Sequence, residues 1–429
     1  MGYLSSDDEH VFEPHQIFKL CAVILFGNIL YYYLQNGPWE ALKLSADLYV
    51  FLSAAKTIWD GQSYLLYDTD YYYDIAHAVG PYNNPPFLAI VLSPLTLLPF
   101  KMVSIIWIGL NFLILCTSVT IIWYESKLRN IWVFITLFAV CGFFGPLIGD
   151  THWANVNSIV WLTLLLAWWF FKHNRFFLCG VALAVGVIIK LIPVMLIGYF
   201  LFRRQYRVCL AACVTLAVLL TFSIIVLGGF AEHLAWFDMM GHYNSGAGKG
   251  GTPMDQSIGG FFKHLASQGF IGDALVHPLA YLINFSILIL TFLMCRFKPV
   301  EPDDRTFDLE YGLVASLPLL VTSMIVIAPH FTILLTTYLL LLYYLIVRKK
   351  EIPFLIYPIL GLSYALVSIG AFGGPAFSHG LMILFQSPKL YGALLLWGIC
   401  IYLLYQERFG KSAPFATNRS PVFAKESTE

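Results

Sequence analysis

A single lysine stands near the middle of a long apolar run. The run extends from Phe176 to Phe202, Lys190 lies inside it, and Pro193 follows three residues later. An ammonium group at such a position costs about 2.5–3.5 kcal/mol on insertion scales unless it faces water, protein or an anion. Pro193 also divides the run into two short helices, and broken helices at membrane depth are tolerated where they line a protected cavity. We therefore predict a cavity around Lys190.

His330 is a second candidate for this cavity. It follows Ala328 and Pro329 at the end of an apolar segment. A lone histidine at such a place is more often a structural group than a ligand-binding one. Beside Lys190, however, it would complete a cationic site that holds a phosphate strongly in a medium of low dielectric constant. Zinc is disfavoured because no histidine lies four residues further on and no thiolates share the face.

Asp47 is the candidate general base. Apolar residues at positions 48, 51, 52, 55, 58 and 59 predict an amphipathic helix over residues 47–60, which ends at Gly61 and lies on the membrane surface. At the start of this helix, Asp47 either caps the helix or accepts a proton from a substrate hydroxyl. A capping carboxylate stays ionised but is a weak base, so the reaction would need a good leaving group.

Seven other polar side chains are candidates for binding a sugar or an acceptor. Two of them precede a pair of prolines, four surround one short loop, and one begins a helix after a proline. Each group has a structural alternative, which is a rigid turn or a helix cap. Together these side chains suit a polyhydroxyl ligand. The candidates are Asn83, Asn84, Asp150, His152, Asn155, Asn157 and Gln256.

Two motifs that could hold a cofactor are weak. Asp68-Thr69-Asp70 has the spacing of a metal and nucleotide-sugar motif of soluble enzymes, but no nucleotide-binding fold accompanies it. The glycine-rich segment 246–252 contains Lys249 but lacks the following Ser or Thr and the preceding strand of a phosphate-binding loop. We therefore predict that the protein uses no cofactor and no metal.

The composition indicates that membrane helices position these residues. Of 429 residues, 59% are hydrophobic and 12% are charged, and the mean hydropathy is +0.74. The apolar stretches have helical length, which favours an all-α polytopic membrane protein over a barrel. The formal net charge of zero argues against a nucleic-acid partner. We predict roughly twelve crossings, near 17–35, 103–123, 131–148, 157–171, 176–189, 192–202, 208–228, 276–295, 311–328, 332–347, 352–370 and 389–405.

The distribution of basic residues predicts the orientation of these helices. Clusters of Lys and Arg recur in the loops of one side, which we assign to the cytoplasm. The opposite side receives a first extracytoplasmic loop, 36–102, a second large loop, 230–275, and all the candidate site residues. This assignment of loops to sides requires that residues 86–100 do not cross the membrane but form a re-entrant or shallow segment. The basic clusters are Lys127 and Arg129; Lys172 and Arg175; Arg203, Arg204 and Arg207; Arg296 and Lys298; Arg348, Lys349 and Lys350; and Arg408 and Lys411.

Taken in order, the motifs resemble those of glycosyltransferase family 87, which are membrane enzymes of the GT-C type. The resemblance covers most of the chain, from Ser45 to about Leu335, and departs from the family where Trp153-Ala154-Asn155 replaces a Gly-Gln pair and where Ala328 replaces a serine. The matching segments are Ala46-Asp47-Leu48-Tyr49, Tyr64-Leu65-Leu66-Tyr67, Tyr82-Asn83-Asn84-Pro85-Pro86-Phe87, Asn155-Val156-Asn157, Lys190-Leu-Ile-Pro193, Gln256-Ser257 and Ala328-Pro329-His330.

This resemblance implies a fold and a domain organisation. The expected fold is a GT-C type bundle of roughly twelve transmembrane helices, with amphipathic helices in the first extracytoplasmic loop. One transmembrane glycosyltransferase domain would span residues 1–410, and residues 411–429 would form a disordered cytoplasmic tail.

The resemblance also implies an activity. An inverting glycosyltransferase would move a sugar, with mannose as the leading candidate, from a polyprenyl-monophosphate donor to a glycolipid or glycan acceptor at the extracytoplasmic face of the cell membrane. Asp47 maps to the catalytic aspartate, and Lys190 and His330 map to residues near the donor phosphate. Two alternatives stay open, which are a polyprenyl-phosphate pentosyl (arabinofuranosyl) transferase and a transporter or flippase of a lipid-linked sugar.

Overall fold

The computed structural model describes residues 46–68, 70–71, 81–127, 130–244, 253–295, 297–322, 325–348 and 352–409. These residues form helices and connecting segments, and no strand occurs among them, which confirms the all-α prediction. The predicted first crossing at 17–35, the glycine-rich segment 246–252 and the predicted tail 411–429 lie outside the described residues.

Five helices in the described part of the chain are long and apolar enough to cross a membrane. They are α6 (Phe100–Glu125), α12 (Tyr206–Leu227), α15 (Asp273–Met294), η3 together with α17 (Ala328–Val347), and α19 (Pro388–Phe409). A sixth span results if α7 (Ile131–Gly142) and α8 (Gly145–Trp153), which are bent by 62°, count as one. The protein is therefore a multi-pass membrane protein, and the number of twelve crossings stays a prediction.

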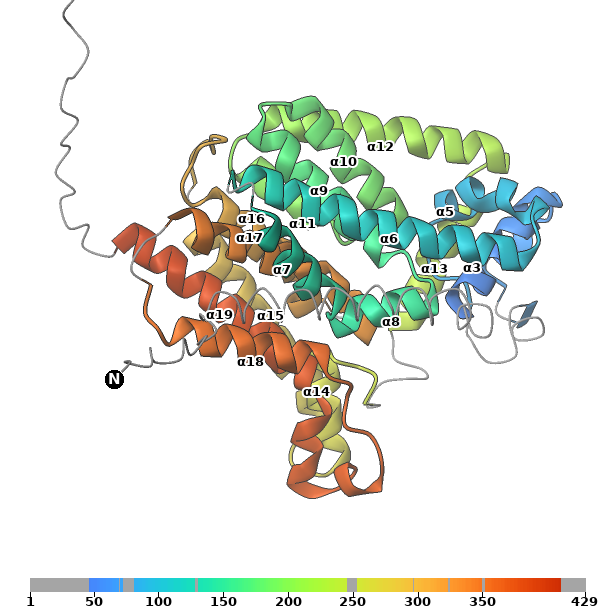
Figure 1. The fold of residues 1–429 in the computed structure, drawn as a ribbon. Helices are drawn as coiled ribbons and strands as arrows, with labels where there is room; N and C mark the ends of the chain where they lie inside the picture. Colours follow the sequence, from blue (N-terminus) through green and yellow to red (C-terminus); the bar gives the residue numbers. More distant parts are fainter. Residues whose placement is uncertain are drawn as a thin grey trace, which may run out of the picture.

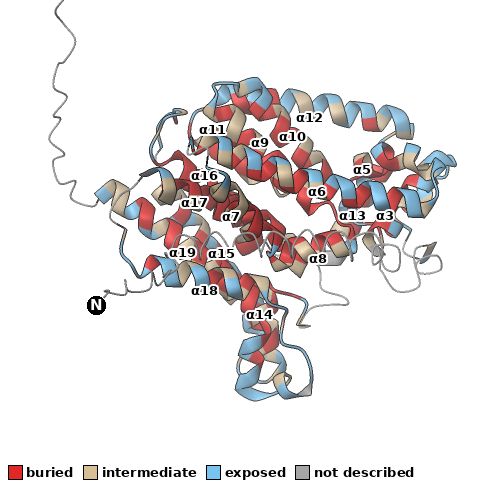
Figure 2. Ribbon diagram, in the orientation of Figure 1, coloured by how far each residue is buried: buried red, intermediate tan, exposed pale blue. Residues whose placement is uncertain are grey.

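The remaining predicted crossings coincide with shorter helices. These are α9 (Asn157–Lys172), α10 (Phe176–Ile189), α11 (Val194–Phe202), α16 (Phe307–Val321) and α18 (Ile356–Ser368). Figure 2 shows that the buried residues concentrate where α9, α16 and α17 lie, whereas α12 is exposed along much of its length. An apolar helix that is mostly exposed in this way is suited to face lipid.

The segment that precedes α6 forms a short helical layer at one end of the long helices (Figure 1). It contains α3 (Ala46–Trp59), η1 (Ser63–Leu65), α5 (Pro86–Leu92) and η2 (Ser93–Leu97). The apolar face of α3, with Leu48 and Phe51, is buried and packs against α5 and η2. Gly61 has a φ of +72°, a conformation that favours glycine, and the chain turns there as predicted. That α3 lies on a membrane surface, and that residues 86–100 are shallow, stay predictions.

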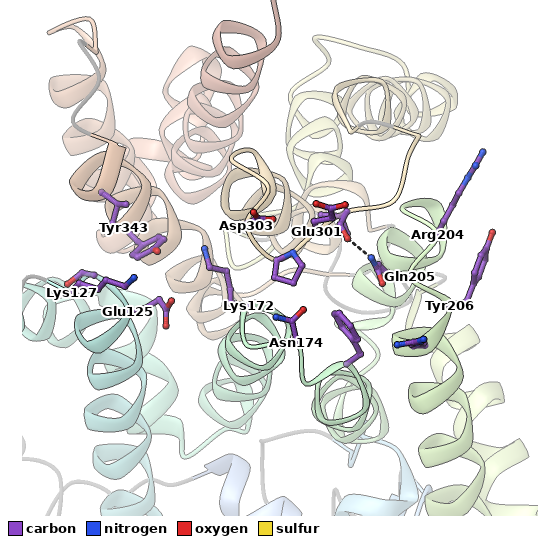
Figure 3. A pocket seen from close by; sticks show the side chains of 16 residues that line it. Glu125, Lys127, Lys172, Asn174, Arg204, Gln205, Tyr206, Glu301, Asp303 and Tyr343 are labelled. Carbon is purple, nitrogen blue, oxygen red and sulfur yellow. Dashed lines mark hydrogen bonds between the residues drawn. The ribbon is translucent and has the colours of Figure 1, made fainter. Parts of the chain in front are cut away.

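Basic side chains from the predicted cytoplasmic loops meet at another place. Lys127, Lys172, Arg204 and Arg207 line one open pocket of about 960 Å³, together with acidic side chains such as Glu301 (Figure 3). These residues lie at or between the ends of α6, α9, α11 and α12. Loops that are far apart in sequence therefore share one side of the molecule, as the charge pattern predicts.

Arg203, which the sequence places in a cytoplasmic basic cluster, is fully buried instead of exposed. Its guanidinium donates to the backbone oxygen of Lys298 at 2.9 Å, to Asp304 at 3.1 Å and to the buried carboxylate of Glu310. Burial alone would raise the pKa of Asp304, yet hydrogen bonds from Thr306 and the charge of Arg203 hold that pKa below its usual value. This network joins α11 to α16, and removal of one buried ionic partner typically costs about 3–5 kcal/mol.

Gly145, at the start of α8, provides a test of the packing that holds this helix. A Cβ at this position would overlap the backbone carbonyl of Ser368 at the end of α18, and backbone cannot move aside cheaply. We expect Gly145→Ala to lower the free energy of unfolding by about 1–3 kcal/mol. Gly149→Ala in the same helix is the matched control, since nothing lies within 4 Å of its added Cβ. Thermal unfolding in detergent measures both variants, and an equal melting temperature for the two would contradict the packing of α8 against α18.

Candidate active site

A cavity of about 210 Å³ collects side chains from segments that are far apart in the sequence. Asp47, Lys190 and His330 all line it, on α3, at the break between α10 and α11, and on η3 (Ala328–Ile333). Part of the wall is apolar, and α13 (Ala231–Asn244) contributes Trp236 and Met240 to it. Further polar side chains in the lining are Asn83, Asn84, Asn155 and Thr322.

The helix break at Lys190 forms as predicted. The first half, α10, ends at Ile189, Lys190 has an extended backbone with φ −156° and ψ 127°, and α11 begins after Pro193. The two halves pack closely at Gly186, where an added Cβ would lie 2.5 Å from Thr163 Oγ1 and 2.8 Å from Pro193 Cγ. Glycine is therefore required for this break to close. The Lys190 ammonium donates a hydrogen bond of 2.7 Å to Asn157 Oδ1.

Asp47 lies in the first turn of α3 and receives a hydrogen bond from across the cavity wall. Asn155 Nδ2 donates to Asp47 Oδ2 at 2.7 Å. Asn155 follows Ala154, whose φ of 51° ends α8 in the left-handed region and turns the chain back toward α3. The Asn155 side-chain oxygen accepts from the backbone N–H of Val156 at 2.7 Å and from Asn157 Nδ2 at 2.9 Å. Both ends of the Asn155 amide are thus fixed.

Asp150 and Asn157, both predicted as sugar or acceptor ligands, lie one layer beneath the cavity instead of in its lining. Both are fully buried. Asn157 Nδ2 donates to Asp150 Oδ1 at 2.7 Å, and the backbone N–H of Ser158 donates to Asp150 Oδ2 at 2.9 Å. Asp150 therefore caps the start of α9, where a carboxylate also interacts favourably with the helix dipole.

The His330 ring is oriented by a backbone group three residues earlier in the chain. Its ring Nδ1 accepts a hydrogen bond of 3.4 Å from the backbone N–H of Ile327, which leaves Nε2 to carry the proton in the neutral ring. The preceding segment is held by the start of α14 (Ile258–Ser267). Gln256 N–H donates to Val326 O at 2.8 Å, and Val326 N–H donates to Asp255 Oδ1 at 3.3 Å.

Gln256, predicted as a ligand contact, has protein groups as the hydrogen-bond partners of its amide. The Gln256 amide is buried outside the cavity lining. Its Nε2 donates to Pro253 O at 2.7 Å and to Gln386 O at 2.6 Å, and its Oε1 accepts from the backbone N–H of Lys389 at 3.2 Å. Gln256 therefore ties the segment before His330 to the start of α19.

His152 is also absent from the cavity lining, although it lies only three residues before Asn155, in the last turn of α8. Its ring lies against the ring of Trp153, with centroids 6.1 Å apart. Asp68, the first residue of the DxD motif, accepts hydrogen bonds from the backbone N–H groups of Asp70 at 3.0 Å and Tyr71 at 3.1 Å. Asp68 thus stabilises a local turn. Across the described ranges, no three His, Cys, Asp or Glu side chains come together as a metal site would require.

Sequence reasoning missed the tryptophan in the cavity wall. Trp236 Nε1 donates to the backbone oxygen of Asn83 at 3.2 Å, so α13 is anchored to the turn that carries Asn83 and Asn84. Trp236 lies in the predicted second large loop, 230–275, and belongs to no recognisable motif. A single tryptophan in an apolar chain carries no signal that separates it from an interfacial anchor.

Comparison with known proteins places these features in a family. A profile described as glycosyltransferase family 87 matches residues 82–329. A polyprenol-phosphate-mannose-dependent alpha-(1-2)-phosphatidylinositol mannoside mannosyltransferase of Mycobacterium tuberculosis is 27% identical over 213 residues, which cover 45% of this chain and 47% of that protein. A polyprenol-phosphate-mannose-dependent alpha-(1-2)-phosphatidylinositol pentamannoside mannosyltransferase of Mycolicibacterium smegmatis is 27% identical over 233 residues, which cover 53% of this chain and 54% of that protein.

The chain spans about half the length of the curated relatives that it matches. No solved structure matches it significantly.

Proposed function

Because this chain belongs to glycosyltransferase family 87, we propose that it is an inverting glycosyltransferase that moves mannose from a polyprenyl-monophosphate donor to a glycolipid or glycan acceptor. The observation that carries the proposal is that Asp47, Lys190 and His330 line one cavity. A carboxylate beside an ammonium group and an imidazole N–H is what this transfer requires, since the carboxylate must accept a proton and the other two must bind a phosphate. The mycobacterial relatives use a donor of this kind, as their names state.

The proposed reaction is a single displacement. Asp47 accepts the proton of an acceptor hydroxyl as its oxygen bonds to the anomeric carbon of the donor. The bond between that carbon and the phosphate oxygen breaks at the same time, so the configuration inverts. The electron pair of the broken bond stays on the departing polyprenyl phosphate, which gains one negative charge. Lys190 and the N–H of His330 would stabilise this charge, and such preorganised donors act most strongly in a site that excludes water.

The remaining lining residues suit the other parts of the substrates. Asn83 and Asn84 offer amide groups for sugar hydroxyls, and apolar residues such as Leu191 and Leu319 can contact the isoprenoid chain. We also propose the GT-C type bundle with roughly twelve crossings, and a site that faces the extracytoplasmic side of the cell membrane. The presence of Lys127, Lys172, Arg204 and Arg207 around one pocket supports this orientation.

A direct assay tests the proposed function. Purified protein in detergent is incubated with radiolabelled polyprenyl-phosphate-mannose and a total lipid extract, and we expect a new mannosylated product. Because the mechanism needs no metal, EDTA should leave the rate unchanged. Radiolabelled polyprenyl-phosphate-arabinofuranose serves as the competing donor. Transfer from that donor alone, or loss of activity with EDTA and its recovery with Mn²⁺, would contradict the proposal as stated.

A further inference from the structure

A continuous chain of hydrogen bonds connects Asp47 to Lys190 beneath the floor of the cavity. Asn155 Nδ2 donates to Asp47 at 2.7 Å, Asn157 Nδ2 donates to Asn155 Oδ1 at 2.9 Å, and Lys190 Nζ donates to Asn157 Oδ1 at 2.7 Å. The two groups to which we assign proton transfer and phosphate binding are therefore joined through two asparagines. Asn157 is the residue that bonds to both Lys190 and Asn155.

The hydrogen-bonding capacity of Asn157 leaves little for a ligand. A primary amide has two N–H donors, and those of Asn157 are used by Asp150 Oδ1 at 2.7 Å and Asn155 Oδ1 at 2.9 Å. Its oxygen is used by the Lys190 ammonium. Asn157 is also fully buried. A sugar hydroxyl could reach this amide only by breaking a contact that a buried polar group needs.

Asp150 determines the donor and acceptor orientation of both amides in this series of hydrogen bonds. Its two oxygens accept only, so the NH₂ group of Asn157 must face Asp150 and the oxygen of Asn157 must face Lys190. The oxygen of Asn155 then faces Asn157, and the NH₂ group of Asn155 faces Asp47. Reversal of either amide would place donor against donor or acceptor against acceptor. One buried carboxylate thereby orients both amides.

We propose that Asp150 and Asn157 are positioning residues, which hold the side chains of Asp47 and Lys190 at fixed positions relative to each other, rather than residues that bind the sugar. The proposal rests on the proposed function for the roles of Asp47 and Lys190. Asn157 acts on phosphate binding through Lys190, and it acts on proton transfer through Asn155. Loss of the Asn157 amide therefore affects both phosphate binding and proton transfer, whereas loss of the Asn155 amide affects proton transfer alone.

Two binding probes distinguish this role from direct contact with the sugar. The probes are undecaprenyl phosphate, which carries no sugar, and undecaprenyl-phosphate-mannose. We expect Asn157→Leu to weaken the binding of both by the same factor, about 10-fold, and to lower kcat by about 30-fold or more, because hydrogen bonds to charged groups are lost. Asn155→Leu should lower kcat and leave the affinity for undecaprenyl phosphate within about twofold, since Lys190 keeps its contact with Asn157.

Asn111→Leu is the matched control. Asn111 is a buried amide on α6 whose Nδ2 donates to Trp107 O at 3.0 Å and whose oxygen accepts from the Ser158 hydroxyl. The control makes the same substitution in the same neighbourhood without a contact to Lys190 or Asp47. We expect it to match Asn157→Leu in melting temperature while both affinities and kcat stay within about threefold of the wild type.

The measured affinities distinguish a positioning role of Asn157 from sugar binding and from general destabilisation. A loss of affinity in Asn157→Leu that is confined to the mannose-bearing probe would assign Asn157 to the sugar site and overturn the proposal. Equal losses in Asn157→Leu and Asn111→Leu would overturn it as well, because they would reflect general destabilisation. If the wild-type protein transfers no mannose, the proposed function fails. The affinity for undecaprenyl phosphate still tests the link from Asn157 to Lys190 in that case.

Discussion

Asp47→Asn is expected to lower the turnover of mannose transfer by about 10²–10⁴-fold, the usual contribution of a general base, and to leave donor affinity within about twofold. Asparagine has nearly the same size as aspartate but accepts no proton at neutral pH. The Asn155 amide that donates to Asp47 Oδ2 can still donate to the oxygen of an asparagine. The local structure should therefore survive while the chemical step is lost, which places the effect in kcat.

The control for this prediction is Asp60→Asn, just beyond the other end of α3. Asp60 is a carboxylate that pairs with Lys56 at 2.9 Å on the exposed side of the helix, and it does not line the cavity. An exposed pair four residues apart contributes little, so Asp60→Asn should keep wild-type turnover. Radiolabelled mannose transfer under single-turnover conditions measures the chemical step in both variants. Turnover of Asp47→Asn that is close to wild type would remove Asp47 from the role of base.

The parts of the site that could be predicted from the sequence are those with a local physical signature. A lysine and a proline in an apolar run predict a helix break near Lys190, because charge and a missing N–H act at the position itself. Gly61 ends α3 for a similarly local reason. The pattern of basic loops also predicts which segments share a side, and the cavity does contain Asp47, Lys190 and His330 together.

Whether each polar side chain lines the cavity or lies beneath it could not be predicted from the sequence. Asp150, Asn155 and Asn157 lie within eight residues of one another, at the end of α8, in the connection and at the start of α9, yet only Asn155 lines the cavity. Ala154 ends α8 in the left-handed region, and Asn155 just after it reaches Asp47, whereas Asp150 on α8 bonds to the start of α9. Alanine gives no sign of such a turn, since glycine or asparagine is the usual residue there.

Partners that are distant in sequence account for the other differences. Gln256 has the position of a ligand contact, but Gln386 and Lys389, about 130 residues further on, satisfy its amide. Arg203 has the position of a cytoplasmic surface residue, but it is buried because Glu310 lies opposite to it. A single sequence does not pair such residues, and tertiary packing alone decides whether each polar group faces protein or ligand.

Lys190→Met is expected to weaken the binding of undecaprenyl phosphate by about 10–100-fold. Methionine keeps most of the length and apolar volume of the lysine stem but removes the ammonium, and a charge-assisted hydrogen bond to phosphate is worth about 1.5–3 kcal/mol. Lys190→Arg should recover part of the affinity, because it restores the charge with a different geometry. Equilibrium binding in detergent micelles measures all three proteins.

Lys389→Met is the matched control for this second prediction. Lys389 is an almost fully buried lysine, and its ammonium donates to the backbone oxygens of Val367 at 2.6 Å and Ile369 at 2.7 Å. It lies outside the cavity lining, so its loss can lower the melting temperature but should leave the affinity of the folded protein unchanged. If Lys190→Met and Lys389→Met bind undecaprenyl phosphate equally well, a phosphate does not bind at the helix break. If only Lys190→Met loses affinity, the charge within the apolar run is there to bind an anion, because loss of a buried lysine alone would have affected both variants.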